Sequence, residues 1–139
     1  DFDKGSEAYF AGDYATALQE WRPLAEQGDA EAQASLGYMY DNGYGVIQDY
    51  TEVVNWYRKA AEQGYASAQT NLGIMYYDGN GVLQDAVIAH MRYNISSANG
   101  DATGSHNRRV IERRMTSEQI AEAQALARRC MASDYQDCD

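Results

Sequence analysis

Residues 29–64 and residues 65–100 align without a gap, which gives the chain an internal repeat with a period of 36 residues. The two segments are identical at 14 of the 36 aligned positions, among them Gly37 with Gly73. Repeats of this length are typical of solenoids, in which each unit buries its core only against neighbouring units. The repeat therefore limits the fold to a linear stack of similar units.

Each unit is predicted to contain two helices. In its first half, apolar side chains recur at spacings of three and four, as on one face of a helix: Ala32, Leu36, Met39 and Tyr40. The Gly-x-Gly segments at 43–45 and 79–81 are predicted to end this helix. Asp49 and Asp85 are predicted to begin the second helix, because an aspartate carboxylate can accept hydrogen bonds from the free backbone N–H groups of the first turn. The pattern predicts an all-α fold of about four antiparallel helix pairs.

Two glycines stand in the middle of the predicted first helices. Gly37 and Gly73 should each cost their helix about 1 kcal/mol relative to alanine. A close approach of a neighbouring helix would compensate for this cost, so we expect both glycines to be packing positions.

These features are concentrated in three segments, which read LGYMYDNGYGVIQD (residues 36–49), WYRKAAEQG (residues 56–64) and LGIMYYDGNGVLQD (residues 72–85). The segments resemble the signature of Sel1-like repeats, which are related to tetratricopeptide repeats. The resemblance implies a right-handed α-α superhelix, a helical solenoid whose concave face binds a protein or peptide.

The chain is predicted to be a single domain, residues 1–139, made of four units. Residues 1–28 form a first unit with a shorter turn, similar to a tetratricopeptide repeat, and residues 29–64 and 65–100 are the two full repeats. Residues 101–139 are expected to form a C-terminal capping helix pair, because they lack the glycine turn and carry a polar, arginine-rich helix. Within this unit, Thr116 and Gln119 have the spacing of a capping box.

The negative charge is confined to the first two thirds of the chain. The formal net charge is −10, and residues 1–91 carry 14 acidic against 4 basic side chains. Such a surface repels phosphate, which disfavours nucleic acids and anionic membranes as partners. No apolar run is long enough for a transmembrane helix, so no membrane insertion is expected. We expect a monomer whose unknown partner is a basic or neutral protein or peptide.

The two cysteines, Cys130 and Cys138, give the only indication of the cellular compartment. An unbroken helix would hold them about 12 Å apart, too far for a disulfide. They can pair if the helix ends and the chain turns back at residues 133–135, where short polar residues compete for backbone hydrogen bonds. We expect a disulfide between them, which would indicate a periplasmic or secreted protein. The alternative is two unpaired thiols on a frayed tail, which would fit the cytoplasm.

The chain begins within an apparent repeat unit, at Asp1 instead of a methionine. A signal peptide removed before Asp1 or an artificial boundary would both produce this start. Together with the cysteines, it favours the periplasmic or secreted location.

No catalytic or metal-binding pattern stands out, so we predict a protein that is not an enzyme and needs no cofactor. The Ser-x-x-Lys pattern of penicillin-binding enzymes is absent, since Asp1 and Trp56 precede the two lysines by three residues. His90 and His106 lie too far apart for a shared metal site and are interpreted as surface residues. The alternative function, taken from cysteine-rich Sel1-like relatives, is an enzyme or binder that acts on β-lactams or cell-wall fragments.

The resemblance also implies which side chains face the concave groove. The predicted binding surface consists of Tyr9, Glu31, Tyr38, Asp41, Thr70, Ile74, Tyr77, Asp78, His106 and Arg113. Tyrosine and carboxylate side chains dominate it, and tyrosine is favoured at binding surfaces. Tyr38 and Tyr77 could instead belong to the core. The arginines at 108, 109, 113 and 114 either bind a carboxylate or form a solvated end face.

Overall fold

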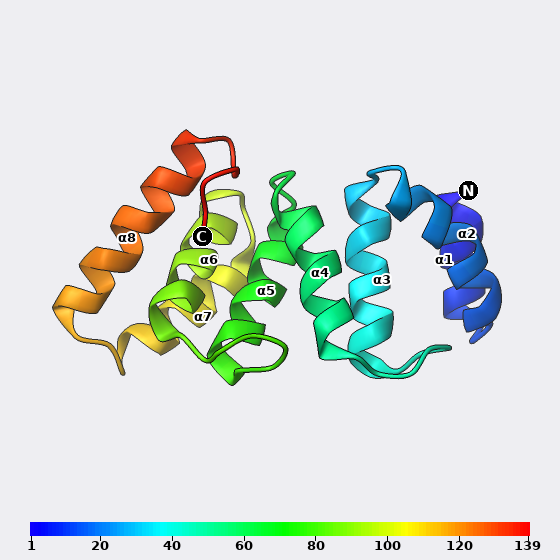
Figure 1. Ribbon diagram of the computed structural model, residues 1–139, viewed down its shortest axis with the longest axis horizontal. Coiled ribbons are helices and arrows are strands. Elements are labelled where there is room, and N and C mark those ends of the chain that lie inside the picture. Colours follow the sequence, from blue (N-terminus) through cyan, green and yellow to red (C-terminus); the bar gives the residue numbers. More distant parts are fainter.

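A computed structural model describes all residues from 1 to 139 and contains eight helices and no strand (Figure 1). In chain order the helices are α1 (Phe2–Phe10), α2 (Tyr14–Glu26), α3 (Ala30–Asn42), α4 (Tyr50–Ala61), α5 (Ala66–Asp78), α6 (Ala86–Ala98), α7 (Ala102–Glu112) and α8 (Ser117–Ala132). The predicted all-α class and the helix pair in each repeat are confirmed. None of the eight helices has both the length and the apolarity that crossing a bilayer requires.

The helices form a row in which α1 to α7 pack mainly on their neighbours in sequence (Figure 1). The row runs from α1 and α2 at one end to α8 at the other. Its core consists of successive apolar clusters instead of one central core. One cluster joins α2 to α3 and is centred on Trp21 and Leu36, and the next joins α4 to α5 around Tyr57 and Leu72. This arrangement is the one expected of a solenoid.

The mid-helix glycines are packing positions, as predicted. A Cβ atom on Gly37 would lie 2.6 Å from Cε1 of Tyr57, and one on Gly73 would lie 2.6 Å from Cε1 of Tyr93. Both tyrosine rings are buried. Each first helix therefore receives the aromatic ring of its own second helix at the point where it lacks a side chain.

The loops between paired helices reach back to the preceding unit. Gly43 and Gly79 end α3 and α5 in the left-handed conformation, with φ angles of 68° and 74°. Two residues later the loop backbone meets the previous second helix, where a Cβ on Gly45 would come within 2.8 Å of Tyr14 Cβ. Gly81 approaches the Tyr50 carbonyl in the same way. The Gly-x-Gly pattern thus encodes both a helix end and a contact between units.

Polar side chains also repeat with the fold. The Asp49 carboxylate accepts hydrogen bonds from the first turn of α4, and that of Asp85 from the first turn of α6, as predicted. Gln33 and Gln69, which are also identical between the repeats, are buried. The Gln33 side chain donates to the Ala25 carbonyl at 3.1 Å, and that of Gln69 to the Ala61 carbonyl at 2.7 Å.

The C-terminal unit contains two helices, α7 and α8, which pack mainly on α6 instead of on each other. The capping box of Thr116 and Gln119 is present at the start of α8. However, α8 packs mainly on α6 and only slightly on α7. Its apolar face meets Met91 and Ile95 of α6, while α7 covers a different face of α6 through Ile111 and Tyr93. The two last helices therefore enclose α6 from two sides.

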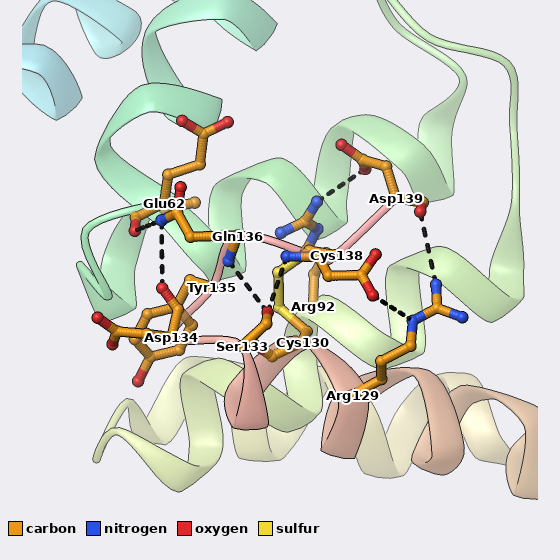
Figure 2. Close-up of a disulfide and its surroundings, with 12 residues drawn as sticks. Glu62, Arg92, Arg129, Cys130, Ser133, Asp134, Tyr135, Gln136, Cys138 and Asp139 are labelled. Atoms are coloured by element: carbon orange, nitrogen blue, oxygen red, sulfur yellow. Dashed lines mark hydrogen bonds and ion pairs between the residues drawn. A yellow bond between two sulfur atoms is a disulfide. The ribbon is translucent and has the colours of Figure 1, made fainter.

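Cys130 and Cys138 form a disulfide, with their Cα atoms 4.4 Å apart (Figure 2). The predicted turn occurs where expected, because α8 ends at Ala132 and both Asp134 and Tyr135 have positive φ angles, 56° and 66°. The expectation of a disulfide is confirmed. A disulfide is consistent with an extracytoplasmic location.

The segment after the turn folds back onto the preceding repeats (Figures 1 and 2). Tyr135 packs on Gly64 of the α4–α5 loop, and Gln136 donates to the Glu62 carbonyl at 3.2 Å. The Asp139 carboxylate accepts from Arg58 at 2.7 Å and from the buried Arg92 at 3.0 Å. The disulfide thus holds a tail that joins α8 to α4 and α6.

Candidate functional site

One face of the row is formed by the first helix of each pair, α1, α3, α5 and α7, and it contains two pockets. The larger, called here the N-terminal pocket, has a volume of about 460 Å³ and lies between α1, α3 and the start of α5. Six of its lining residues are aromatic: Phe2, Tyr9, Phe10, Trp21, Tyr38 and Tyr65. Its polar lining consists of Ser6, Glu31, Ser35, Ser67 and Asn71.

Tyr9 is at the centre of the aromatic wall. Its ring centroid lies 5.2 Å from that of Phe10, 5.7 Å from that of Trp21 and 6.4 Å from that of Tyr38. These distances are in the range of favourable aromatic pairs, so the rings support one another. Burial raises the pKa of Tyr9, and the neighbouring hydroxyls of Tyr38 and Tyr44 raise it further. The Tyr9 hydroxyl therefore stays protonated to a higher pH than that of a free tyrosine.

The carboxylate of Glu31 lies at the edge of this pocket, on α3. Burial raises the pKa of Tyr65, and the negative charge of Glu31 is the next contribution in the same direction. Glu31 is exposed and takes part in no ion pair. The N-terminal pocket thus combines aromatic walls with one uncompensated negative charge.

The second pocket, called here the C-terminal pocket, has a volume of about 210 Å³ and lies between α5 and α7. It is lined by Ile74, Tyr77, Tyr93, Asn107, Val110 and Ile111. The hydroxyl of Tyr77 accepts a hydrogen bond of 2.6 Å from Nη1 of Arg114, which fixes the position of that ring.

Two carboxylates lie near the C-terminal ends of α3 and α5. Burial raises the pKa of Asp41, and the negative charge of Asp78 raises it further. The same two charges reach the buried tyrosines beneath them, because the pKa of Tyr57 is raised by burial and then by Asp41, and that of Tyr93 by burial and then by Asp78. The face formed by the first helices therefore also carries negative charge where α3 and α5 end.

The structure places the ten residues predicted for the binding surface in three groups. Tyr9, Glu31 and Tyr38 line the N-terminal pocket, and Ile74 and Tyr77 line the C-terminal pocket. Asp41 is half-buried and Asp78 is exposed, and His106 and Arg113 are exposed but line neither pocket. Of the two tyrosines that could instead have belonged to the core, Tyr38 is 46% exposed, whereas Tyr77 is half-buried.

The prediction that Thr70 faces the groove is wrong, because Thr70 is buried and its hydroxyl donates to the carboxylate of Asp101. That bond occupies the Asp101 side chain, which makes no hydrogen bond to the first turn of α7. Thr70 therefore joins α5 to the start of α7 and offers no groove surface.

The prediction that His90 is a surface residue is also wrong, since His90 is fully buried. Its Nε2 atom lies 2.8 Å from a carboxylate oxygen of Glu112, so it links α6 to α7. Its position corresponds to Val54 in the preceding repeat, which is an apolar core residue. No group of three or more His, Cys, Asp or Glu side chains is arranged to hold a metal ion.

Several pocket residues were not predicted from the sequence: Phe2, Ser6, Trp21, Tyr65, Ser67 and Asn71. Four of them could have been found by extending the helical spacing of three or four residues backward from a predicted position. From Tyr9 this spacing leads to Ser6 and Phe2, and from Ile74 it leads to Asn71 and Ser67. Trp21 and Tyr65 had no such signal, because neither belongs to the face of a first helix.

Comparison with known families and structures supports the repeat assignment. The sequence model of the Sel1 repeat matches residues 30–65 and 66–101. A crystal structure of a protective antigen present in uropathogenic Escherichia coli strains, described as displaying an SLR fold, is 31% identical and superposes with a TM-score of 0.88. The similarity covers 94% of this chain but 30% of the antigen, so the chain spans less than a third of that protein.

A Sel1 repeat protein from Oxalobacter formigenes is 35% identical with a TM-score of 0.71, and the similarity covers 78% of this chain and 84% of that one. Comparison with curated proteins gives no match. The two segments matched by the family model together span more than half of the 139 residues, so the chain belongs to the Sel1 repeat family.

Proposed function

We propose that this chain is a binding module which holds a segment of another protein, or a peptide, on the face formed by α1, α3, α5 and α7. The observation that carries the proposal is the pair of pockets on that face, about 460 Å³ and about 210 Å³ in volume, lined by side chains from successive first helices. Sel1 repeats form scaffolds of stacked helices, and such scaffolds commonly bind proteins along an extended surface.

The chemistry of the pockets supports binding over catalysis. Their linings consist of aromatic and aliphatic side chains, hydroxyls, amides and the single carboxylate of Glu31. Tyrosine and tryptophan offer large contact areas with little loss of side-chain entropy, and they are enriched among the residues that dominate binding energies. We therefore propose that the protein is not an enzyme. The disulfide supports a periplasmic or secreted location as part of the same proposal.

The test begins with a photo-crosslinking amino acid placed at Ser35, in the N-terminal pocket, and at Gln124, an exposed position on α8. Crosslinking in the native compartment should yield a specific partner from Ser35 and not from Gln124. The partner identified in this way is then purified, so that its affinity can be measured directly.

The double variant Tyr38→Ala/Tyr77→Ala should weaken binding of the purified partner at least about tenfold, because each change truncates a pocket wall. The control variant Ile47→Ala/Leu83→Ala removes side chains that are 88% and 90% exposed on the loops, outside both pockets, and should bind normally. Circular dichroism would establish that both variants are folded. An unchanged dissociation constant for the tyrosine variant would exclude the proposed face.

A further inference from the structure

Cations and aromatic rings meet repeatedly within this chain, but not in the N-terminal pocket. The ammonium of Lys59 lies 4.5 Å from the Trp56 ring centroid. The guanidinium groups of Arg22 and Arg58 each lie 6.0 Å from a tyrosine ring, those of Tyr40 and Tyr76 respectively. The six aromatic rings of the N-terminal pocket have no such neighbour, and no lysine or arginine lines the pocket.

The charge around the pocket is negative without compensation. Glu31 is exposed and forms no ion pair, and its charge, together with that of Asp29, raises the pKa of Tyr65, which lines the same pocket. Residues 1–91, which include the whole pocket, carry 14 acidic and 4 basic side chains. The faces of aromatic rings attract cations, and a nearby carboxylate adds to that attraction.

We infer that the N-terminal pocket is a site for a basic side chain, arginine or lysine, presented by the bound segment. The inference rests on the proposed function, because it assigns one anchor of a segment held on the same face. The cation would lie against the rings of Tyr9 and Tyr38 with Glu31 as its counter-ion. A volume of about 460 Å³ lies within the range of small-molecule sites, which leaves room for a long side chain and some adjoining backbone.

The two tryptophans of the chain allow a direct test. Trp21 lines the pocket, whereas Trp56 does not and serves as an internal reference. The probe is the peptide acetyl-Gly-Arg-Gly-amide, followed by NMR through the indole N–H signals. Matched peptides replace arginine by lysine or by citrulline, which is nearly isosteric with arginine but neutral. The arginine and lysine peptides should shift the Trp21 signal in a saturable manner and leave that of Trp56 in place.

The neutral peptide should bind at least about fivefold more weakly, because it lacks both the cation–π and the ionic attraction. In the variant Glu31→Gln, the affinity for the arginine peptide should fall about three- to tenfold, while that for the citrulline peptide stays the same. The matched control Glu122→Gln makes the same charge change at an exposed position on α8 and should alter neither affinity. Glu31 is exposed, so its substitution leaves folding intact.

Equal affinities for the arginine and citrulline peptides, or no effect of Glu31→Gln, would overturn the inference, as would the absence of any Trp21 shift. Its failure can be told apart from failure of the proposed function. If a crosslinked partner needs Tyr38 and Tyr77 but binds the Glu31→Gln variant normally, the face binds but the anchor is not a cation. If the peptides bind as expected but the partner ignores both tyrosines, the pocket assignment stands and the proposed function fails.

Discussion

At the scale of single residues, the contact of Gly73 with Tyr93 explains why glycine is kept in a helix. The ring of Tyr93 lies where a side chain at position 73 would be, and it is buried beneath α5. The same contact occurs 36 residues earlier between Gly37 and Tyr57, so both partners repeat with the unit. Because glycine destabilises the middle of a helix, the sequence predicted that a neighbouring helix comes close at these positions. That the contact is made by a tyrosine ring became known only from the structure.

The variant Gly73→Ala should be less stable by about 1–3 kcal/mol, because its Cβ would overlap the Tyr93 ring and the buried ring cannot move away freely. Helix propensity alone predicts the opposite sign, a gain of about 0.5–1 kcal/mol. Urea unfolding followed by circular dichroism measures the difference. A stabilised variant would show that the contact does not constrain position 73.

At the scale of elements, buried glutamine side chains connect each repeat to the one before it. Gln33 and Gln69 each donate to a carbonyl near the end of the preceding second helix, at Ala25 and Ala61. These two carbonyls also accept from the backbone N–H groups of Gly28 and Gly64, at 3.1 and 2.9 Å, so each glutamine adds a second hydrogen bond that comes from the next unit. Gln69 has a second role, because its carbonyl oxygen accepts from the buried guanidinium of Arg92 at 3.3 Å.

Replacing Gln69 by leucine should lower the free energy of unfolding by about 1–3 kcal/mol, since it removes two buried hydrogen bonds, one to the Ala61 carbonyl and one from Arg92. The equivalent change Gln33→Leu should cost less, because the side-chain oxygen of Gln33 accepts from the exposed Gln63 at 2.9 Å, a donor that water can satisfy after the change, whereas Arg92 is buried. Gln124→Leu on the exposed face of α8 is the control and should change stability by no more than about 0.5 kcal/mol. Equal losses at 33 and 69 would argue against the Arg92 contact.

At the scale of the whole molecule, the disulfide-linked tail joins the last helix to earlier units of the stack. Residues 133–139 reach from α8 back to the α4–α5 loop and to α6, so they connect units that are not adjacent in sequence (Figure 2). Burial lowers the pKa of Arg92, and the carboxylate of Asp139 opposes that effect. The tail therefore supplies the counter-charge for a buried cation.

The variant Cys130→Ser/Cys138→Ser should lose about 2–3 kcal/mol of stability, as expected for a cross-link that closes a short loop. Hydrogen exchange should then show faster exchange in the tail and at the α4–α5 loop. The Trp21 indole signal should not move, because the N-terminal pocket lies at the other end of the row. Reductant added to the unmodified protein should reproduce these effects, and continued protection of the tail amides in the variant would contradict this role of the disulfide.

The sequence by itself determined the repeating architecture, because the signals for it are local. Helix ends at Gly43 and Gly79, helix starts at Asp49 and Asp85, and the packing glycines all depend on neighbours within one period, so they could be recognised from a pattern of 36 residues. The turn that allows the disulfide depended likewise on a few adjacent residues.

Only the tertiary structure decided which side chains come together across units. The burial of Thr70 and His90, the packing of α8 on α6, and the docking of Asp139 on Arg92 each join residues from different units, at sites where the repeat pattern has lapsed. The N-terminal pocket is of the same kind, since Trp21 and Tyr65 meet the first helices only through the stacking of three units. The repeat pattern determines the helices and turns of each unit. The contacts that differ from one unit to the next depend on how the units stack.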